Sequence, residues 1–296
     1  FWLYVGTILI GVGIAFGNVL TPGIIKMNFP LRIGIMTGYY TVVMNIFGSV
    51  SSYVTAPLVK HFNYNIAISL IGIVTFIGII TWSFQLNKHD TVNSSQTTTN
   101  INVWKSPLSW QITLLMGGQS MIFYSLINWL PEFLLSHGTP INEAGIYLSI
   151  LQLAIIPLTF VTPIFAEKLK NQVLITFVTG LLFVLGILTL MLQPNWAFLG
   201  IILIGVASGL AFGLVNTFFG LRTENGLTAA KLSGMSQSVG YLFAAIGPLL
   251  FGILHDATNS WNMSFGILLV TSIIIMIIGS RAGRNITIEQ TLGARH

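Results

Sequence analysis

The sequence of 296 residues contains no cysteine and very few charged residues. Without cysteine, disulfide bonds, thiolate nucleophiles and sulfur-ligated metal sites are excluded. Charged residues make up 6% of the chain, against about 25% in an ordinary globular domain. So few charges cannot cover the surface of a soluble protein of this length, and 54% of the residues are hydrophobic. We therefore expect the apolar side chains to face lipid.

The sequence lacks the residues that several classes of function need. The basic residues form no stripe with interleaved aromatics, so nucleic acid is not expected as a partner. The five histidines lie far apart in loops and near the chain's end, and the sequence therefore predicts no catalytic residue, metal site or cofactor. No nucleotide-binding loop is present, so transport would be driven by a gradient rather than by ATP. A membrane-embedded enzyme or a channel is the more distant alternative, since nothing resembles a selectivity filter.

Nine apolar runs without charged residues are long enough to cross a membrane. A hydrocarbon core about 30 Å thick needs about 20 apolar residues in helical form. The runs are residues 1–25, 33–58, 63–86, 110–130, 144–166, 173–193, 196–221, 232–254 and 260–280. The sequence therefore predicts an all-α membrane protein with nine transmembrane helices.

Basic residues separate the connecting segments into two sets. Eleven of the twelve lie in alternate connections or after the last run, and Lys60 alone lies in the other set. The eleven are Lys26, Arg32, Lys88, Lys105, Lys168, Lys170, Arg222, Lys231, Arg281, Arg284 and Arg295. Because cytoplasmic loops are enriched in lysine and arginine, this set is predicted to be cytoplasmic. The C-terminus would then lie inside and Phe1 outside.

The longest connection divides the chain. Residues 87–109 contain NKHDTVNSSQTTTNINVWK, a polar segment without an apolar period. We predict a cytoplasmic linker between a partial N-terminal half-bundle of three helices, residues 1–86, and a C-terminal six-helix half-bundle with its tail, residues 110–296. The alternative is a single bundle with one long loop.

An internal repeat relates the first three predicted helices to the last three. Residues 9–19 read LIGVGIAFGNV, and residues 203–215 read LIGVASGLAFGLV. Met36 then precedes Gly48 by twelve residues, as Met235 precedes Gly247. Such parallel repeats are typical of certain transporters, although glycine-rich apolar helices also resemble one another by chance. If the repeat is real, residues 110–193 should have counterparts upstream of residue 1, and we expect this chain to be the last nine of twelve helices.

Four stretches resemble the cyanate and nitroimidazole transporters of the major facilitator superfamily. They are GIAFGNVLTPGIIKMNFPLRIGIMTGYY from residue 13, GGQSMIFYSLINWLPEFL from residue 117, AGIYLSILQLAIIPLTFVTP from residue 144, and RTENGLTAAKLSGMSQSVGYLFAAIGPLLFGILHDATNSW from residue 222. The resemblance implies the major facilitator fold, with the last three helices of one half and the complete second half. It also implies secondary active transport of a small solute by alternating access, in a bacterial cytoplasmic membrane. Helices 1–25, 110–130 and 196–221 would line the cavity, and helices 33–58, 144–166 and 232–254 would shape it.

The chain departs from this family at a gating motif. The superfamily places an acidic residue, then basic residues and a glycine, in a cytoplasmic loop. Here the loop reads Glu167-Lys168-Leu169-Lys170-Asn171, without the glycine or arginine. A clamp that holds a gate and an ordinary basic loop are both open interpretations.

The middle of the predicted helices holds neutral polar side chains. An amide or phenol in hydrocarbon is costly unless it is hydrogen-bonded, so these groups must meet one another, the backbone, water or a solute. The candidate substrate-binding residues are Asn18, Gln119, Tyr124, Asn128, Gln152, Asn216, Gln237 and Tyr241. The alternative for each is a structural hydrogen bond between helices. We hypothesise that Asn128, Asn216 and Gln237 face one common cavity.

Other polar and small residues are interpreted as structural. Glu132 and His255-Asp256 are predicted to cap helix ends, and the Arg222 side chain is predicted to extend to the membrane surface. Two stripes of small residues are predicted to let helices pack closely. They are Gly34, Gly38, Thr41, Asn45, Gly48 and Ser52 in one helix, and Gly209, Gly213, Asn216 and Gly220 in another.

The expected partners are a small-molecule substrate and the lipid bilayer. Neutral side chains favour a small polar or aromatic solute, such as a nitroimidazole. Cyanate is an anion and would need a cation at depth, which we expect only in the upstream helices. Coupling to a proton gradient is expected from the superfamily alone. The alternative is an efflux pump for other small organic compounds or drugs.

Overall fold

The computed structural model describes residues 2–61, 64–84 and 101–293, and most of them lie in long α-helices. The long helices are α1 (Trp2–Asn28), α2 (Ile33–His61), α3 (Tyr64–Ser83), α4 (Pro107–Ser136), α5 (Ile141–Lys168), α6 (Val173–Leu192), α7 (Ala197–Leu221), α8 (Gly226–Thr258) and α9 (Trp261–Ala282). Two 3₁₀ turns, η1 (Val103–Lys105) and η2 (Pro194–Trp196), precede α4 and α7, and a short helix, α10 (Ile288–Thr291), follows α9. Each predicted apolar run falls on one long helix.

Six helices of the described chain are long and apolar enough to cross a membrane. They are α1 and the five helices from α5 to α9. The predicted class, an all-α membrane protein, agrees with this finding. The count of nine membrane spans stays a prediction.

The chain divides into two compact units. The first holds Phe1–Thr41 and Ile101–His296, and the second holds Val42–Asn100. The second unit contains the remainder of α2 and all of α3. Most of the predicted linker, residues 85–100, lies outside the described residues. The proposed division into residues 1–86, 87–109 and 110–296 therefore stays a prediction.

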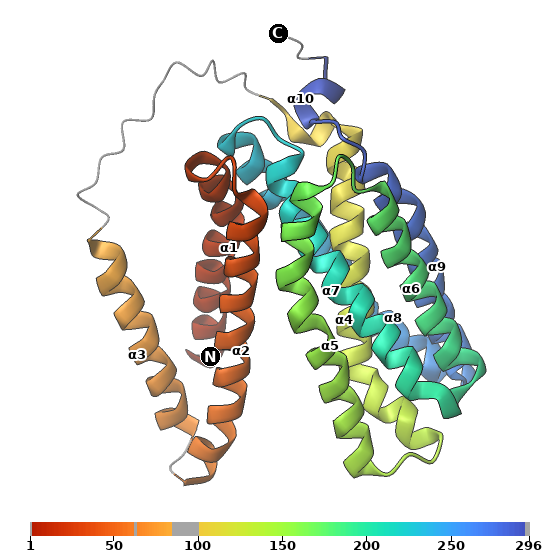
Figure 1. The fold of residues 1–296 in the computed structure, drawn as a ribbon. Coiled ribbons are helices and arrows are strands. Elements are labelled where there is room, and N and C mark those ends of the chain that lie inside the picture. Colours follow the sequence, from red (N-terminus) through yellow and green to blue (C-terminus); the bar gives the residue numbers. More distant parts are fainter. Residues whose placement is uncertain (1, 62–63, 85–100, 294–296) are drawn as a thin grey trace. The chain divides into compact units, whose positions relative to one another are not determined.

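Helices α4 to α9 of the first unit run alternately in opposite directions, so their connections fall at two opposite ends (Figure 1). Within this unit α4 packs most extensively on α8, α5 packs on α7, and α6 packs on both α7 and α9. The fully buried core includes the aromatic side chains of Phe183, Phe218, Phe219 and Phe265. Helix α1 packs on α8, which brings the start of the chain against its second half.

Polar residues fix where several helices begin. The Asn225 side chain accepts a hydrogen bond of 2.8 Å from the backbone N–H of Thr228, at the start of α8. Ser260 caps α9, and Pro107 occupies the first turn of α4, where no backbone donor is needed. Helix α8 therefore begins six residues before the predicted run at 232, because its first turns are capped rather than apolar.

Glycine allows α5 and α7 to approach closely, as the stripe on α7 predicts. A Cβ at Gly209 would lie 2.6 Å from the Leu158 Cβ atom and 2.7 Å from the Ile155 carbonyl oxygen. A Cβ at Gly213 would lie 2.9 Å from the Thr162 Cβ atom. Contacts of this kind stabilise helix pairs in lipid, where no hydrophobic force drives helices together.

Replacing Gly209 with leucine should reduce the yield of folded protein, because the side chain must push α5 away from α7. Overpacking of this kind costs about 1–3 kcal/mol. The measurement is the monodisperse fraction in detergent by size-exclusion chromatography. Gly266→Leu is the matched control, since a Cβ at Gly266 would meet no atom within 4 Å. Equal loss in both variants would show that the added side chain itself, and not the approach of α5, causes the defect.

Candidate functional site

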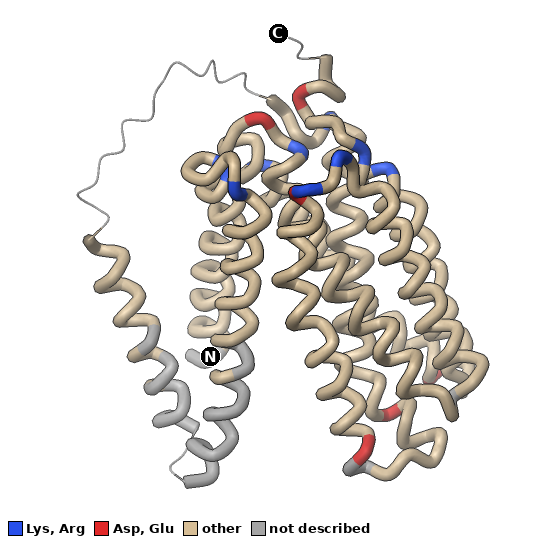
Figure 2. Tube along the Cα trace, viewed as in Figure 1, with Lys and Arg blue, Asp and Glu red and all other residues tan. Residues whose placement is uncertain are grey.

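One end of the first unit carries the basic residues. Every lysine and arginine coloured in Figure 2 lies at this end, which we call the basic end. The last turn of α1 holds Lys26, and Arg32 follows in the connection to α2. Arg222 directly follows α7, and Lys231 lies in the second turn of α8. The alternation of basic loops predicted from the sequence is thus present in the fold of the described residues.

At the basic end, small residues bring α1 and the first turns of α2 against α5 and α8. A Cβ at Gly23 of α1 would lie 2.8 Å from the Gly226 carbonyl oxygen. A Cβ at Gly38 of α2 would lie 3.0 Å from the Phe160 carbonyl oxygen. The Thr41 hydroxyl donates a hydrogen bond of 3.0 Å to the carbonyl oxygen of Thr159. This part of the predicted stripe on α2 is confirmed as a packing surface.

Glu167 of α5 adds a charged group to the contact between α5 and the first turn of α2. Its Oε2 atom accepts a hydrogen bond of 3.0 Å from the backbone N–H of Gly34, in the first turn of α2. A carboxylate is favoured there, because the N-terminus of a helix carries free N–H groups and a positive partial charge. The acidic residue of the incomplete motif therefore contacts another helix directly, which favours the interpretation as a clamp.

Replacing Glu167 with glutamine should weaken closure of the basic end. The amide keeps an acceptor but loses the charge, which is worth about 0.3–1 kcal/mol at a helix N-terminus. We therefore expect a single cysteine at Ala230, which lies beside Gly23, to react with a maleimide about two to five times faster. Glu143→Gln, at an exposed position in the first turn of α5, should leave the rate unchanged. Equal rates in both variants would remove the proposed role of Glu167.

Arg222 does not extend to the membrane surface, and that prediction was wrong. Its side chain is 1% exposed. Nε donates to the Ala282 carbonyl oxygen at 3.0 Å, and Nη2 donates to the Gly283 carbonyl oxygen at 3.1 Å and to Oε1 of Gln172. The guanidinium lies 4.9 Å above the Phe218 ring, and burial lowers the pKa of Arg222 to about 10. Backbone carbonyls at the end of α9, which sequence spacing cannot place, hold the side chain inside.

Deeper in the bundle, polar side chains from α1, α2 and α8 meet. Gln237 of α8 donates from Nε2 to the Asn18 carbonyl oxygen at 3.0 Å and to the Ser233 hydroxyl at 2.8 Å. The Tyr40 hydroxyl of α2 donates to Oδ1 of Asn18 at 2.6 Å. Asn18 of α1 therefore joins two helices through its side chain and its backbone. Two of the predicted site residues, Asn18 and Gln237, are brought into direct contact.

Two further predicted residues extend this group. Tyr241, one turn along α8 from Gln237, lies in the neighbourhood of both Tyr124 of α4 and Tyr40. We call Asn18, Tyr40, Tyr124, Gln237 and Tyr241 the tyrosine–amide cluster. Gln237 is 7% exposed, whereas Tyr124 is 41% exposed. The cluster is thus buried toward the basic end and accessible on its other side.

On the N-terminal side of Asn18, helix α1 no longer packs on α8. From Asn18 onward it contacts α8, while all of residues 7–17 are exposed. A Cβ at Gly11, Gly13 or Gly17 would meet no atom within 4 Å. The cluster therefore lies where the packing of α1 on α8 ends.

Gln119 of α4 and Asn216 of α7, two further predicted site residues, donate hydrogen bonds within their own helices. Gln119 is buried and donates from Nε2 to the neighbouring Ser120 hydroxyl at 2.7 Å. Asn216 is 7% exposed and donates from Nδ2 to the Phe212 carbonyl oxygen at 2.9 Å. The amide nitrogen of each residue thus has an acceptor within its own helix.

Asn128 and Gln152 lie at exposed positions. Asn128 donates from Nδ2 to the carbonyl oxygen of Tyr124, one turn earlier in α4, at 2.8 Å. Gln152 is exposed on α5. The hypothesis that Asn128, Asn216 and Gln237 share one cavity stays a prediction.

Tyr40 was missed by the sequence reasoning. The signal was ambiguous, because Tyr39 and Tyr40 are adjacent in one apolar run. Tyr39 is 54% exposed and its ring lies 5.9 Å from the Phe160 ring, whereas the Tyr40 hydroxyl binds Asn18. Neighbouring residues of a helix point about 100° apart, and only the packing of α2 determines which of them faces α1.

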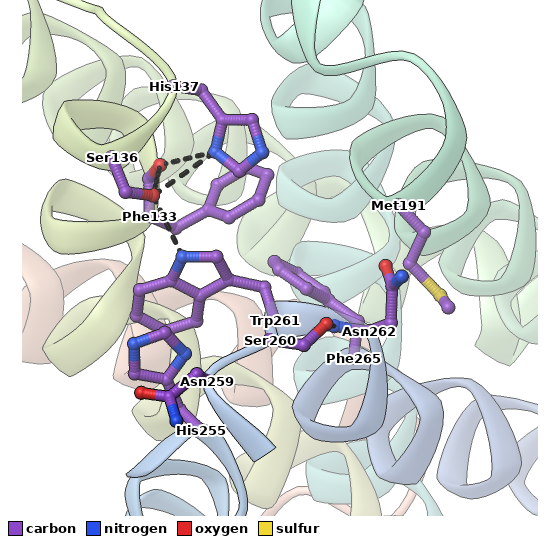
Figure 3. A pocket seen from close by; sticks show the side chains of 10 residues that line it. All are labelled: Phe133, Ser136, His137, Met191, His255, Asn259, Ser260, Trp261, Asn262 and Phe265. Carbon is purple, nitrogen blue, oxygen red and sulfur yellow. Dashed lines mark hydrogen bonds between the residues drawn. The ribbon is translucent and has the colours of Figure 1, made fainter.

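A pocket lies at the end opposite the basic end, between the connections α4–α5 and α8–α9 (Figure 3). Its volume is about 410 Å³. Trp261 stacks on His255 with the ring centres 3.6 Å apart, and its Nε1 donates to the Ser136 hydroxyl at 2.8 Å. His137 is paired with Ser136 and with the Phe133 carbonyl oxygen. Ser136, His137 and Trp261 of this outer pocket are thus joined by hydrogen bonds, and none of the predicted substrate-binding residues lines it.

Comparison with known proteins identifies the family. The model of the Major Facilitator Superfamily matches residues 1–245. The chain belongs to the major facilitator superfamily. It is 41% identical to the uncharacterized transporter YycB of Bacillus subtilis (strain 168), over 98% of this chain and 73% of that protein. It is 36% identical to the 2-nitroimidazole transporter of Escherichia coli (strain K12), over 96% and 73%, and 23% identical to the cyanate transport protein CynX of that organism, over 92% and 71%.

Membership of the major facilitator superfamily confirms the resemblance found in the sequence. As a member, the chain is an integral membrane protein with the major facilitator fold, and it transports a small solute. It is a transporter and not an enzyme.

Proposed function

We propose that this transporter moves a small, uncharged, planar solute by alternating access, and that the tyrosine–amide cluster binds it. One observation carries the proposal: hydrogen bonds join Asn18, Tyr40 and Gln237, which come from three helices. They lie where the packing of α1 on α8 ends. A site between helices that can separate is where alternating access requires the solute.

The chemistry of the cluster favours a neutral heteroaromatic solute. The amides of Asn18 and Gln237 offer both donors and acceptors, and the phenols of Tyr40, Tyr124 and Tyr241 offer hydroxyls and ring faces. A nitro group and ring nitrogens can replace the hydrogen bonds that the side chains now make with one another. The 36% identity to a 2-nitroimidazole transporter supports this class of solute.

Cyanate fits the cluster less well. An anion in a site shielded from water needs a cation or several strong donors. The cluster itself contains neutral residues, and Lys26 and Arg222 lie at the basic end. The 23% identity to a cyanate transport protein is also the lower of the two.

The proposed setting is a bacterial cytoplasmic membrane, with the basic end and the C-terminus in the cytoplasm. The positive-inside rule supports this orientation. In the conformation described, the cytoplasmic end would be closed by α1, α2, α5 and α8, and the solute would enter from outside. We further propose that residues 1–86 and 110–296 belong to two halves joined by a cytoplasmic linker, and that a proton gradient drives transport.

The test uses vesicles that hold the full-length protein, with labelled 2-nitroimidazole and labelled cyanate, with and without a pH gradient. We expect saturable transport of 2-nitroimidazole that a pH gradient accelerates, and no cyanate transport above that of empty vesicles. The sign of the effective gradient distinguishes uptake from efflux. Transport of cyanate alone, or of neither solute, would overturn the proposed substrate class. Transport unaffected by the gradient would overturn proton coupling.

A further inference from the structure

A proline inside α1 leaves the backbone carbonyl group of Asn18 without its usual partner in the helix. In an α-helix each carbonyl oxygen accepts a hydrogen bond from the backbone N–H four residues later, and position 22 is a proline, which has no N–H. The proline ring also crowds the carbonyl group four residues before it. The carbonyl oxygen of Asn18 is therefore available to another helix.

Two side chains of α8 bind this carbonyl oxygen. Nε2 of Gln237 donates to it at 3.0 Å, and the Ser233 hydroxyl donates to it at 3.5 Å. Nε2 of Gln237 also donates to the Ser233 hydroxyl at 2.8 Å. Ser233 is completely buried, and Gln237 nearly so. The two hydrogen bonds occupy both N–H groups of the Gln237 amide.

These contacts determine which atom of the Gln237 amide remains for a solute. A backbone carbonyl oxygen can only accept, so the amide atom that faces the Asn18 carbonyl must be the nitrogen. The other atom, Oε1, accepts no hydrogen bond from the described residues, and it is not among their buried polar atoms that lack a partner. Gln237 therefore offers a solute an acceptor and not a donor.

We propose that Pro22 and Ser233 fix the Gln237 amide in this orientation, and that the transporter consequently selects solutes that carry a hydrogen-bond donor such as a ring N–H. The inference rests on the proposed function, because it takes the tyrosine–amide cluster as the solute site. A heteroaromatic ring with an N–H satisfies Oε1 of Gln237. A ring without one excludes water from Oε1 and supplies no donor in its place, which is costly. Pro22 and Ser233 are positioning residues, and Gln237 determines the specificity.

The test compares two isomers, 4-methyl-2-nitroimidazole and 1-methyl-2-nitroimidazole, in vesicles that hold the full-length protein. The first keeps the ring N–H and the second has lost it, while both carry one methyl group. At a pH that keeps the N–H un-ionised, kcat/KM above the background of empty vesicles should be about ten- to hundredfold higher for the 4-methyl isomer. Equal values, or a faster 1-methyl isomer, would overturn the selection. If no methylated ring is transported, 2-nitropyrrole and 2-nitrofuran, which differ by N–H against O, carry the same comparison.

Variants show whether Pro22 and Ser233 position the amide. Pro22→Ala supplies the backbone N–H that Asn18 lacks, so the Gln237 amide can turn and offer Nε2 instead. Pro22→Ala and Ser233→Ala should each reduce the ratio between the isomers about three- to tenfold. An unchanged ratio would overturn the positioning role of the residue replaced. A general defect of folding lowers transport of both isomers and leaves their ratio unchanged.

Pro157→Ala is the matched control for Pro22→Ala. Pro157 also lies inside a long helix, α5, but at an exposed position. The carbonyl group that it leaves without a helical partner belongs to Leu153, which is 65% exposed. Pro157→Ala should therefore keep the ratio between the isomers, and an equal loss in both proline variants would overturn the role of Pro22.

A second measurement needs no solute. Gln237→Leu leaves the Asn18 carbonyl oxygen with the Ser233 hydroxyl, at 3.5 Å, as its donor from α8. Pro22→Ala should raise the midpoint of thermal unfolding by about 2–4 °C more in the Gln237→Leu background than in the parent, because it supplies the donor that this background has lost. An equal change in both backgrounds would overturn the link between Pro22 and Gln237.

The outcomes separate this inference from the proposed function. Transport of both isomers at equal rates would overturn the selection and leave the proposed function intact. Transport of neither pair of solutes, nor of 2-nitroimidazole itself, would overturn the proposed function and the selection with it.

Discussion

Replacing Arg222 with methionine should lower the midpoint of thermal unfolding in detergent by roughly 6–12 °C, from a loss of about 3 kcal/mol. The guanidinium now satisfies the carbonyl oxygens of Ala282 and Gly283 and the side-chain oxygen of Gln172. Methionine fills a similar volume but donates nothing, so the Ala282 carbonyl oxygen and Oε1 of Gln172 lose the Arg222 donors, and the Gly283 oxygen keeps only the Gln172 N–H. Each unsatisfied acceptor costs about 1–3 kcal/mol, part of which entering water recovers near the membrane surface.

Arg281 provides the matched control. It has the same side chain at the same end of the bundle but is exposed. Arg281→Met should change the midpoint by no more than about 2 °C, as is usual for surface substitutions. Arg222→Lys should recover only part of the loss, because an ammonium cannot reproduce the planar fork of donors. Similar midpoints for Arg222→Met and Arg281→Met would contradict the network.

Replacing Gln237 with leucine should reduce transport of the solute by about ten- to hundredfold, without a matching loss of folded protein. Gln237 supplies the amide of α8 to the tyrosine–amide cluster and contacts the Asn18 backbone. Leucine has a similar size, so packing of α8 is retained, but a solute that bonds to this amide would leave its own polar group unpaired. The measurement is the initial rate of solute transport in vesicles, normalised to folded protein.

Gln152→Leu is the informative comparison for this variant. Gln152 was also predicted from the sequence to bind substrate, but it is exposed on α5. A leucine there should leave the transport rate within about twofold of the parent. If Gln152→Leu were the more damaging change, the sequence prediction would be right and the tyrosine–amide cluster would not be the site.

The sequence predicts the helices well, because lipid imposes a simple requirement. Every backbone group must be paired inside a span, so a run without charges becomes a helix. The predicted runs 173–193 and 196–221 differ from α6 and α7 by one residue at one end. Larger differences occur where charge or proline ended the predicted run. Helix α4 continues past Pro131 to Ser136, and α8 begins five residues before Lys231.

The site was predicted less well, because nearly uniform apolar helices do not reveal which face is inward. Tyr124 and Asn128, four residues apart, share a face of α4 and are both exposed, so their spacing alone does not tell a cavity from the lipid. Adjacent tyrosines at positions 39 and 40 likewise cannot be told apart without α1. Arg222 was misjudged for a related reason: its backbone acceptors lie some sixty residues later in the chain, and Gln172 lies fifty residues earlier. Contacts between distant segments decide these roles.

The most direct test of the central claim is protection of the cluster by its solute. With no native cysteine in this sequence, Tyr124→Cys gives a single reactive thiol at an accessible position of the tyrosine–amide cluster. Asn262→Cys places the same thiol at an exposed position in the outer pocket of Figure 3. At about ten times its Kd, 2-nitroimidazole should slow maleimide labelling of Tyr124→Cys about tenfold and leave Asn262→Cys unchanged. Protection of Asn262→Cys with none at Tyr124→Cys would contradict the claim and place the solute in the outer pocket.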